Sequence, residues 1–140
     1  MSSDVQALID AAMKARDSAY APYSNHPVGA AVLTKSGRIF AGCNVENAAF
    51  PLGFCAEANA IGAMVQAGGR QIVHVVVAGP GDLPCMPCGG CRQQVREFSG
   101  ETARPVTICN KDGEIILETT TAELLPHSFG PENVEETRGD

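Results

Sequence analysis

Two short cysteine groups contain the residue types best suited to chemistry in this 140-residue chain. The first is Cys55-Ala56-Glu57, and the second runs from Cys85 to Cys91 as Cys-Met-Pro-Cys-Gly-Gly-Cys. The second group holds two overlapping Cys-x-x-Cys spacings that share Cys88. A Cys-x-x-Cys turn brings two sulfurs within reach of one ion, and a helix N-terminus favours the thiolate that zinc requires.

The number of cysteines leaves several kinds of site open. A proline before the pair and two small residues inside it favour Cys88 and Cys91 as the tight turn, with a third sulfur from Cys55. Three thiolates with one open position make a catalytic zinc site, whereas a fourth thiolate from Cys85 would make a structural one. The Cys-x-x-Cys spacing also occurs in redox pairs of the thioredoxin type.

Glu57 helps to separate these possibilities, because it follows Cys55 by two positions near the start of an expected helix. In a first helical turn, a glutamate can simply interact favourably with the helix dipole. Beside a zinc ion with an open position, the same carboxylate becomes a general acid and base. A Cys or His two residues before Glu, followed by Pro-Cys-x-x-Cys, is typical of zinc-dependent base deaminases, in which the Glu is not a ligand. Both halves are present, and Cys88 follows Cys55 by 33 positions.

Hydrophobic periodicity predicts the elements that position these motifs. The expected helices are Asp4–Tyr20, Cys55–Ala67 and Cys91–Phe98, with a last helical turn at Thr121–Leu125. The expected strands are Val28–Leu33, Ile39–Cys43, Ile72–Ala78, Val106–Cys109 and Glu114–Glu118. This order predicts one α/β domain over residues 1–140, with a sheet of about five strands covered by helices on both faces. The acidic tail after Gly130 is expected to be loose.

The charge and hydropathy patterns exclude some classes of partner. With 10 basic and 16 acidic residues the net charge is −6, which argues against a nucleic-acid partner. We expect no signal peptide and no membrane span, since the longest apolar stretch is Ile72–Ala78. The expected compartment is therefore the cytoplasm, where thiols stay reduced. Cys43 and Cys109, at strand ends among apolar residues, are expected to be inert core cysteines.

Beyond the cysteine motifs, the chain resembles the small, homotetrameric cytidine deaminases from about Tyr20 to about Val134. The blocks that carry the resemblance are Ala21-Pro22-Tyr23-Ser24, Pro27-Val28-Gly29-Ala30-Ala31, Gly42-Cys43-Asn44-Val45-Glu46-Asn47-Ala48, Pro87-Cys88-Gly89 with Cys91-Arg92-Gln93, and Leu124-Leu125-Pro126 with Ser128-Phe129-Gly130-Pro131. The resemblance implies a three-layer α/β/α sandwich around a five-stranded mixed sheet. It also implies hydrolysis of cytidine and deoxycytidine to the uridines plus ammonia, in pyrimidine salvage.

The same resemblance implies roles for particular residues. The implied zinc ligands are Cys55, Cys88 and Cys91, for one ion per chain; the implied proton shuttle is Glu57; and the implied ribose-binding pair is Asn44 and Glu46. Ala48 and Phe129 resemble residues that one subunit lends to a neighbouring subunit's pocket, with Phe129 against the base. An amide and a carboxylate suit sugar hydroxyls, because both accept hydrogen bonds and the amide also donates one.

Three substrate-site positions depart from the family's usual residues. Ala58 stands where an arginine usually follows Cys-Ala-Glu and offsets the charge of the ligand sulfurs, and Arg92 is the nearest cation that could replace it. His26 stands near the base where the family usually has Phe, and Phe50 stands where it often has Tyr. His26 could pack as a ring or offer a hydrogen bond to an unusual substrate. These departures concern catalytic efficiency and substrate choice.

Three other functions remain open at this level. The first is deamination of another aminated nucleoside, such as an antibiotic of the blasticidin S type, although the Asn44 and Glu46 pair favours an ordinary nucleoside. The second is a zinc-stabilised binding module, which predicts Cys85 as a fourth ligand and no role for Glu57. The third is a polynucleotide-editing deaminase, which the negative charge disfavours.

Overall fold

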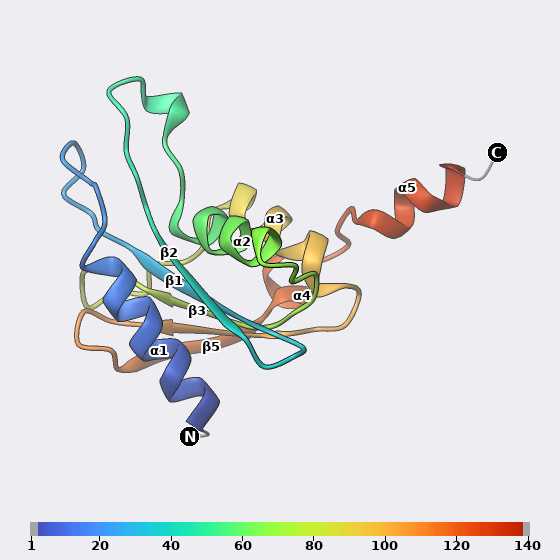
Figure 1. Ribbon diagram of the computed structural model, residues 1–140, viewed down its shortest axis with the longest axis horizontal. Coiled ribbons are helices and arrows are strands. Elements are labelled where there is room, and N and C mark those ends of the chain that lie inside the picture. The colour runs from blue at the N-terminus through green and yellow to red at the C-terminus, as the bar shows by residue number, and fades with distance from the viewer. Residues whose placement is uncertain (1–2, 139–140) are drawn as a thin grey trace.

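A five-stranded mixed sheet in the order β2-β1-β3-β4-β5 forms the centre of the computed structural model, which describes residues 3–138 (Figure 1). Neighbouring strands are antiparallel except for β3 and β4, which are parallel and are joined through α3. The elements are α1 (Ser3–Arg16), β1 (Gly29–Thr34), β2 (Ile39–Cys43), the 3-10 turn η1 (Phe50–Leu52), α2 (Ala56–Gln66), β3 (Ile72–Ala78), α3 (Gly89–Ser99), β4 (Pro105–Cys109), β5 (Ile115–Thr120), α4 (Thr121–Leu124) and α5 (Pro131–Arg138).

Helices cover both faces of the sheet, and this gives the fold its three layers. Along β3, Val75 and Val77 belong to the core under α2 and α3, whereas Val76 and Ala78 belong to the core under α1. This alternation follows from the two-residue period of a strand. The central strand is therefore apolar on both faces, as its valine-rich sequence predicts. The predicted three-layer α/β/α sandwich around a mixed sheet is confirmed.

The strand directions bring the two cysteine motifs to one end of the sheet. Both β2 and β3 run antiparallel to β1, so they point the same way and their carboxyl ends lie at the same edge. Helix α2 follows β2 and α3 follows β3, so both helices start near this edge. Cys55 is the N-cap residue of α2, and Cys88 is the N-cap residue of α3.

Helix α2 lies directly on the backbone of β2 because residue 42 is a glycine. A Cβ atom at Gly42 would lie 2.5 Å from the backbone nitrogen of Ala60 and 2.8 Å from the carbonyl oxygen of Ala56. Asn59 on the same helix donates from Nδ2 to the carbonyl oxygen of Cys43, at 2.7 Å. These contacts fix the start of α2, and therefore Cys55 and Glu57, relative to the sheet.

Several predicted boundaries differ from the structure for identifiable reasons. The first helix ends at Arg16 rather than Tyr20, because Tyr20 pairs with the segment after β2: its N–H donates to Asn44 O at 3.0 Å, and its oxygen accepts from Glu46 N at 2.8 Å. The third helix begins at Gly89 rather than Cys91, with Cys88 as its cap. The remaining predicted helix and strand ends agree with the structure to within two residues, and Ile39–Cys43 and Ile72–Ala78 agree at both ends; η1 was not predicted.

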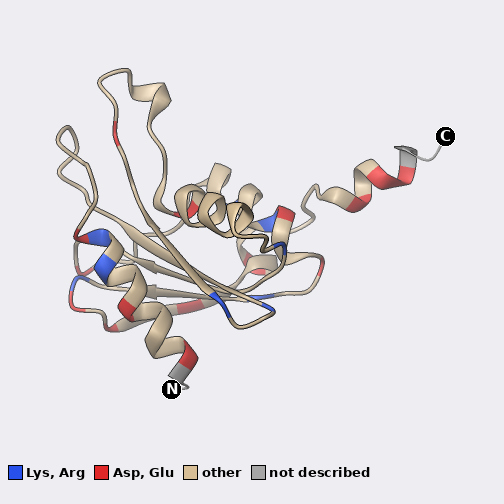
Figure 2. Ribbon diagram, in the orientation of Figure 1, with Lys and Arg blue, Asp and Glu red and all other residues tan. Residues whose placement is uncertain are grey.

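Two of the segments that extend away from the layers in Figure 1 concern the site. One is the loop of residues 44–54 between β2 and α2, which contains η1; the other is α5, which follows Gly130. The sequence predicts a loose tail where the structure has α5, whose first residue is Pro131, a favourable first helical position for proline. Figure 2 shows that α5 is largely acidic, whereas the tip of the 44–54 loop carries no charged residue. None of the helices described within residues 3–138 has the length and apolar content to cross a membrane.

Candidate active site

The sulfur atoms of Cys55, Cys88 and Cys91 form one cluster at the start of α2 and α3. All three Sγ atoms lie within 4.8 Å of one another. Cys91 is buried at 2% exposure, whereas Cys55 and Cys88 are exposed. Two helix N-termini, each with its positive dipole end, meet at these thiols. We call this group the cysteine cluster.

Burial and backbone hydrogen bonds shift the pKa values of the three thiols in the cysteine cluster in different directions. The pKa of the Cys88 thiol is lowered, chiefly because the backbone N–H of Cys91 donates to it. Burial raises the pKa of Cys55 and of Cys91, and the charge of Glu57 acts in the same direction. A divalent ion that prefers sulfur would stabilise the three thiolates together, so the donor set fits zinc.

Cys85 lies outside the cysteine cluster that the described residues form. Its Sγ atom is 3.6 Å from Nε2 of His26, and its Cβ occupies the space beside Gly79, where a second Cβ would approach to 2.5 Å. Burial raises the pKa of the Cys85 thiol, with a smaller contribution from the charge of Glu57. Cys85 is therefore near the site but contacts an imidazole.

Glu57 lies in the first turn of α2 and is buried, at 5% exposure. Burial raises the pKa of its carboxyl group, while its own backbone N–H and the Cys91 thiol lower it. A carboxyl group with a raised pKa is a better proton donor and acceptor near neutral pH than an exposed one. The position next to the cysteine cluster gives this carboxyl access to any molecule bound there.

Asn44 braces the segment before β1 through both ends of its side-chain amide. Its Oδ1 accepts from the backbone N–H of Val28 at 2.8 Å, and its Nδ2 donates to the carbonyl oxygen of His26 at 3.0 Å. The carboxylate of Glu46 accepts hydrogen bonds from the backbone of Tyr23 and Ser24 in the same segment. Both residues thus hold residues 23–28 in place, and both are half-buried.

The carboxylate of Glu46 accepts three hydrogen bonds from one turn. Its Oε1 accepts from the backbone N–H groups of Tyr23, at 2.9 Å, and of Ser24, at 3.1 Å; its Oε2 accepts from the hydroxyl of Ser24. The Ser24 hydroxyl bond is the main cause of the lowered pKa of Glu46. Since a carboxylate offers about four acceptor positions, Glu46 retains capacity for one further donor.

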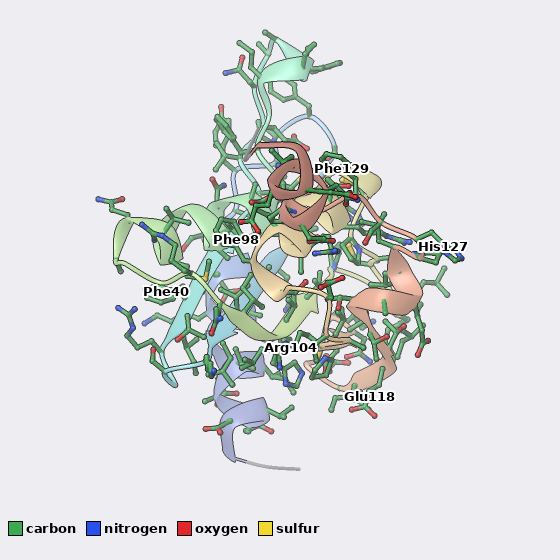
Figure 3. The ribbon with its side chains drawn as sticks, turned by 90° about the vertical axis from the view of Figure 1, so that its right-hand side faces the viewer. Phe40, Phe98, Arg104, Glu118, His127 and Phe129 are labelled. Carbon is green, nitrogen blue, oxygen red and sulfur yellow. The ribbon has the colours of Figure 1, made fainter. Side chains whose placement is uncertain are left out.

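The remaining predicted substrate residues lie on exposed segments. His26 is exposed and contacts Cys85. Ala48 and Phe50 lie in the 44–54 loop, and the ring of Phe50, 74% exposed, meets the ring of Tyr23 edge-on at 5.7 Å. Phe129 is 62% exposed beside the ribbon of α5 (Figure 3). One chain therefore brings the cysteine cluster and Glu57 together but leaves Phe50 and Phe129 open to solvent.

Comparison with known proteins matches this arrangement to one family. The family model described as "Cytidine and deoxycytidylate deaminase zinc-binding region" matches residues 2–108. The chain belongs to this deaminase family. A zinc-binding region and the cysteine cluster coincide in it, so zinc is the ion that the cluster is placed to hold.

Relatives match this family member over nearly their whole length. The cytidine deaminase of Sporosarcina psychrophila is 44% identical over 131 residues, which are 94% of this chain and 95% of that protein. The cytidine deaminase of Halalkalibacterium halodurans is 40% identical over 133 residues, 95% of this chain and 99% of that protein. A crystal structure of cytidine deaminase from Burkholderia pseudomallei has a TM-score of 0.82 and 43% identity, and the match covers 92% of this chain and all of that one.

The side chain of Arg92 does not take the place of the arginine that the family usually has at the position of Ala58. Its Nε donates to the carbonyl oxygen of Pro87 at 2.7 Å, and its Nη1 donates to that of Leu124 at 3.0 Å. These bonds tie the loop before α3 to α4, so the guanidinium is committed to backbone oxygens. The N-termini of α2 and α3 lie at the cluster sulfurs, and the backbone N–H groups of Cys91 and Gly90 donate to Cys88.

Sequence reasoning missed two residues of α3 near Phe129. Gln93 donates from Nε2 to the carbonyl oxygen of Phe129 at 2.8 Å. Arg96, only 7% exposed, donates from Nε to Oγ of Ser128 at 2.7 Å and forms an ion pair with Glu132. The sequence contained one signal, an arginine next to the apolar stripe of a helix, but no indication of its partners.

Proposed function

We propose that this chain catalyses the hydrolytic deamination of cytidine and deoxycytidine to uridine and deoxyuridine, with release of ammonia. The observation that carries the proposal is the cysteine cluster with the buried Glu57 beside it, in a member of the deaminase family. Relatives named cytidine deaminase, with 40–44% identity over nearly the full chain, support the substrate.

The cysteine cluster would hold one zinc ion per chain through Cys55, Cys88 and Cys91. When bound there, zinc activates water as a nucleophile near neutral pH. Cys85 takes no part in binding the ion, since its sulfur faces His26. The three-ligand set leaves one coordination position for the reaction.

Glu57 moves the protons. Its carboxylate accepts a proton from the attacking water and gives it to the ring nitrogen beside C4 as the carbon–oxygen bond forms. A second proton then passes from the hydroxyl added at C4, through the same carboxyl, to the amino group. The hydroxyl oxygen becomes the carbonyl oxygen as the carbon–nitrogen bond breaks and ammonia leaves. The burial that raises the pKa of Glu57 supports this role. It reduces the difference in pKa between the carboxyl group and the groups with which it exchanges protons.

Asn44 and Glu46 bind the sugar hydroxyls in this proposal. Their hydrogen bonds to residues 23–28 hold both side chains in one orientation before substrate arrives. Such preorganisation reduces the entropy that binding must overcome. His26 lies on the same segment and faces Cys85, so it is proposed to line the base side of the pocket with Phe50.

We further propose that the enzyme is a cytoplasmic homotetramer of single-domain subunits spanning residues 1–140, with pockets shared between them. The exposed apolar side chains of the 44–54 loop and the segment before α5 support this assembly, since such patches are typical of interfaces. In this arrangement Ala48 and Phe129 of one subunit complete the pocket of another. Deamination of a blasticidin-type antibiotic is not favoured, given the names of the relatives.

The function is tested with the purified protein, cytidine and a measured metal content. We expect loss of the cytidine absorbance with one ammonia formed per uridine, about one zinc per chain, and loss of activity after chelation that added zinc restores. Blasticidin S serves as the comparison substrate in the same assay. Zinc-loaded protein that leaves cytidine and deoxycytidine unchanged would contradict the proposal.

A further inference from the structure

Helix α5 projects away from the sheet (Figure 1), yet the residues just before it and its first turn are attached to α3. The attachment brackets Phe129, which is itself 62% exposed. Figure 3 shows Phe129 beside the base of α5. The segment therefore combines a fixed backbone with a free aromatic side chain.

Arg96 on α3 makes the main attachment. Its Nε donates to Oγ of Ser128 at 2.7 Å, just before Phe129, and its Nη2 pairs with Oε1 of Glu132, three residues after it. The Arg96 side chain is only 9% exposed, and its Nη1 is buried with no hydrogen-bond partner within residues 3–138. A charge that is this buried is held in one geometry, unlike an ion pair on the surface.

Gly130 allows the guanidinium to lie flat against the backbone next to Phe129. A Cβ atom at Gly130 would lie 2.6 Å from Cζ, Nη1 and Nη2 of Arg96, closer than any side chain could be. On the other side of the peptide, Gln93 donates to the carbonyl oxygen of Phe129 at 2.8 Å. The backbone of Phe129 is thus held from Ser128, from its own carbonyl and from Gly130.

Only arginine matches this set of contacts. Its planar fork reaches Ser128 and Glu132 at once while its flat face covers Gly130, whereas the point charge of a lysine would satisfy one partner. The contacts of Arg96 with Ser128, Gly130 and Glu132 hold the backbone of residues 128–132 in one orientation. The residue whose direction they restrict is Phe129.

We propose that Arg96 is a positioning residue for substrate binding, which aims Phe129 of its own subunit at the base in a neighbouring subunit's pocket. This inference rests on the proposed function, in which Phe129 contacts the base. Arg96 does not touch the reacting atoms, so its loss should act on KM rather than on kcat. The apparent affinity is the intrinsic affinity multiplied by the fraction of time for which Phe129 is correctly directed.

The test compares Arg96→Met, Arg96→Lys and Gly130→Ala with the wild type as zinc-loaded full-length enzyme. If correctly directed Phe129 falls to about one-tenth of the population, KM for cytidine rises about tenfold while kcat stays within about twofold. Arg96→Lys should lie between wild type and Arg96→Met. Glu136→Gln is the matched control. It removes an exposed carboxylate from α5, the helix that contains Glu132, and should leave KM unchanged.

Combination with Phe129→Ala separates this inference from the proposed function. If Phe129→Ala raises KM, and Arg96→Met or Gly130→Ala adds nothing in that background, Arg96 acts through Phe129. If Phe129→Ala raises KM but the Arg96 and Gly130 variants do not, the inference is wrong and the proposed function stands. If Phe129→Ala itself leaves KM unchanged, the shared pocket is wrong and the inference falls with it. Gly130→Ala and Glu132→Gln change the partners of Arg96 but retain Arg96 itself. They test the inference through KM even if Arg96→Met folds poorly.

Discussion

The two ends of the proposed active site are built in different ways. The cysteine cluster and Glu57 sit at the N-termini of two helices that pack on the sheet, and Glu57 is 5% exposed. Phe50 and Phe129, by contrast, lie on segments that project from the layers, with exposures of 74% and 62%. The groups proposed to bind zinc and transfer protons are positioned by the core of one chain. The aromatic side chains proposed to contact the base are largely exposed to solvent in that chain.

This difference suggests a division of work between subunits. Metal binding and proton transfer depend on contacts inside one chain, such as the close approach of α2 to Gly42. In the proposed assembly, recognition of the base depends on surfaces that a second copy completes. Changes in the first region should therefore reduce metal content or kcat, and changes in the second should raise KM.

The largest effect is expected from removing a member of the cysteine cluster. Cys88→Ser should lose most of its zinc and essentially all activity, because Cys88 has the thiol with the lowered pKa and caps α3. Cys85→Ser is the matched control in the same motif and should keep one zinc per chain, since Cys85 faces His26. Metal analysis of the two purified proteins checks this. Zinc loss in Cys85→Ser would indicate a four-thiolate structural site.

Phe129→Ala tests the exposed side of the comparison. Loss of one base–aromatic stack should raise KM for cytidine by about 5- to 100-fold, with zinc content unchanged. Mixing Phe129→Ala subunits with Glu57→Gln subunits should restore a low KM at some sites, because each chain supplies what the other lacks. Steady-state kinetics on the mixture measure this. Mixtures no better than the sum of the two proteins would argue that Phe129 acts within its own chain.

Glu46→Gln should have a smaller effect, because the amide keeps part of the hydrogen bonding. We expect KM for cytidine to rise by about three- to tenfold, the equivalent of one hydrogen bond. The rise should be smaller for a 3′-deoxy nucleoside that lacks the proposed partner. The lowered pKa of Glu46 keeps the wild-type carboxylate ionised at neutral pH. Its contribution to the stability of the fold is therefore complete above the ordinary pKa of about 4.5, and is lost only as pH falls through the lowered pKa. Equal rises for both nucleosides would assign Glu46 to the loop alone.

The smallest effect concerns His74 on β3, whose Nε2 is 2.9 Å from Oγ1 of Thr107. Burial lowers the pKa of His74, against the opposing charge of Glu118, so the folded protein favours the neutral ring. Its contribution to stability is complete above the ordinary pKa of about 6.5 and is lost as pH falls through the lowered value. Between pH 7 and 5 the wild-type Tm should fall more than that of His74→Gln, by no more than about 5 °C. Equal losses would exclude His74 as a source of acid sensitivity, and KM should not change in either case.

The sequence predicts the layers and the cysteine motifs well because both are local patterns. The sequence predicts both ends of Ile72–Ala78 correctly, since a short, valine-rich apolar run favours a buried strand. Cys55-Ala56-Glu57 and Pro87-Cys88 are recognisable because zinc chemistry demands those residue types at short spacing.

What the sequence did not predict depends on long-range contacts. The first helix stops at Arg16 because the next turns pair with residues far along the chain. The bonds of Asn44 and Glu46 to residues 23–28, and of Arg96 to Ser128 and Glu132, join segments 16 to 36 residues apart. Helix α5 follows from such anchoring more than from its own polar sequence. Short-range periodicity contains no record of these pairings.

The measurement closest to the central claim is the activity and zinc content of Glu57→Gln. Glutamine keeps the size of the buried side chain but carries no proton at neutral pH, so the fold and the metal should be retained. If Glu57 moves the protons, kcat for cytidine falls by at least about 10²- to 10⁴-fold with one zinc still bound per chain. If Glu57 only interacts with the dipole of α2, the protein loses less than about 1 kcal/mol of stability and stays active. A Glu57→Gln protein with zinc bound that deaminates cytidine within a few-fold of wild type would contradict the account.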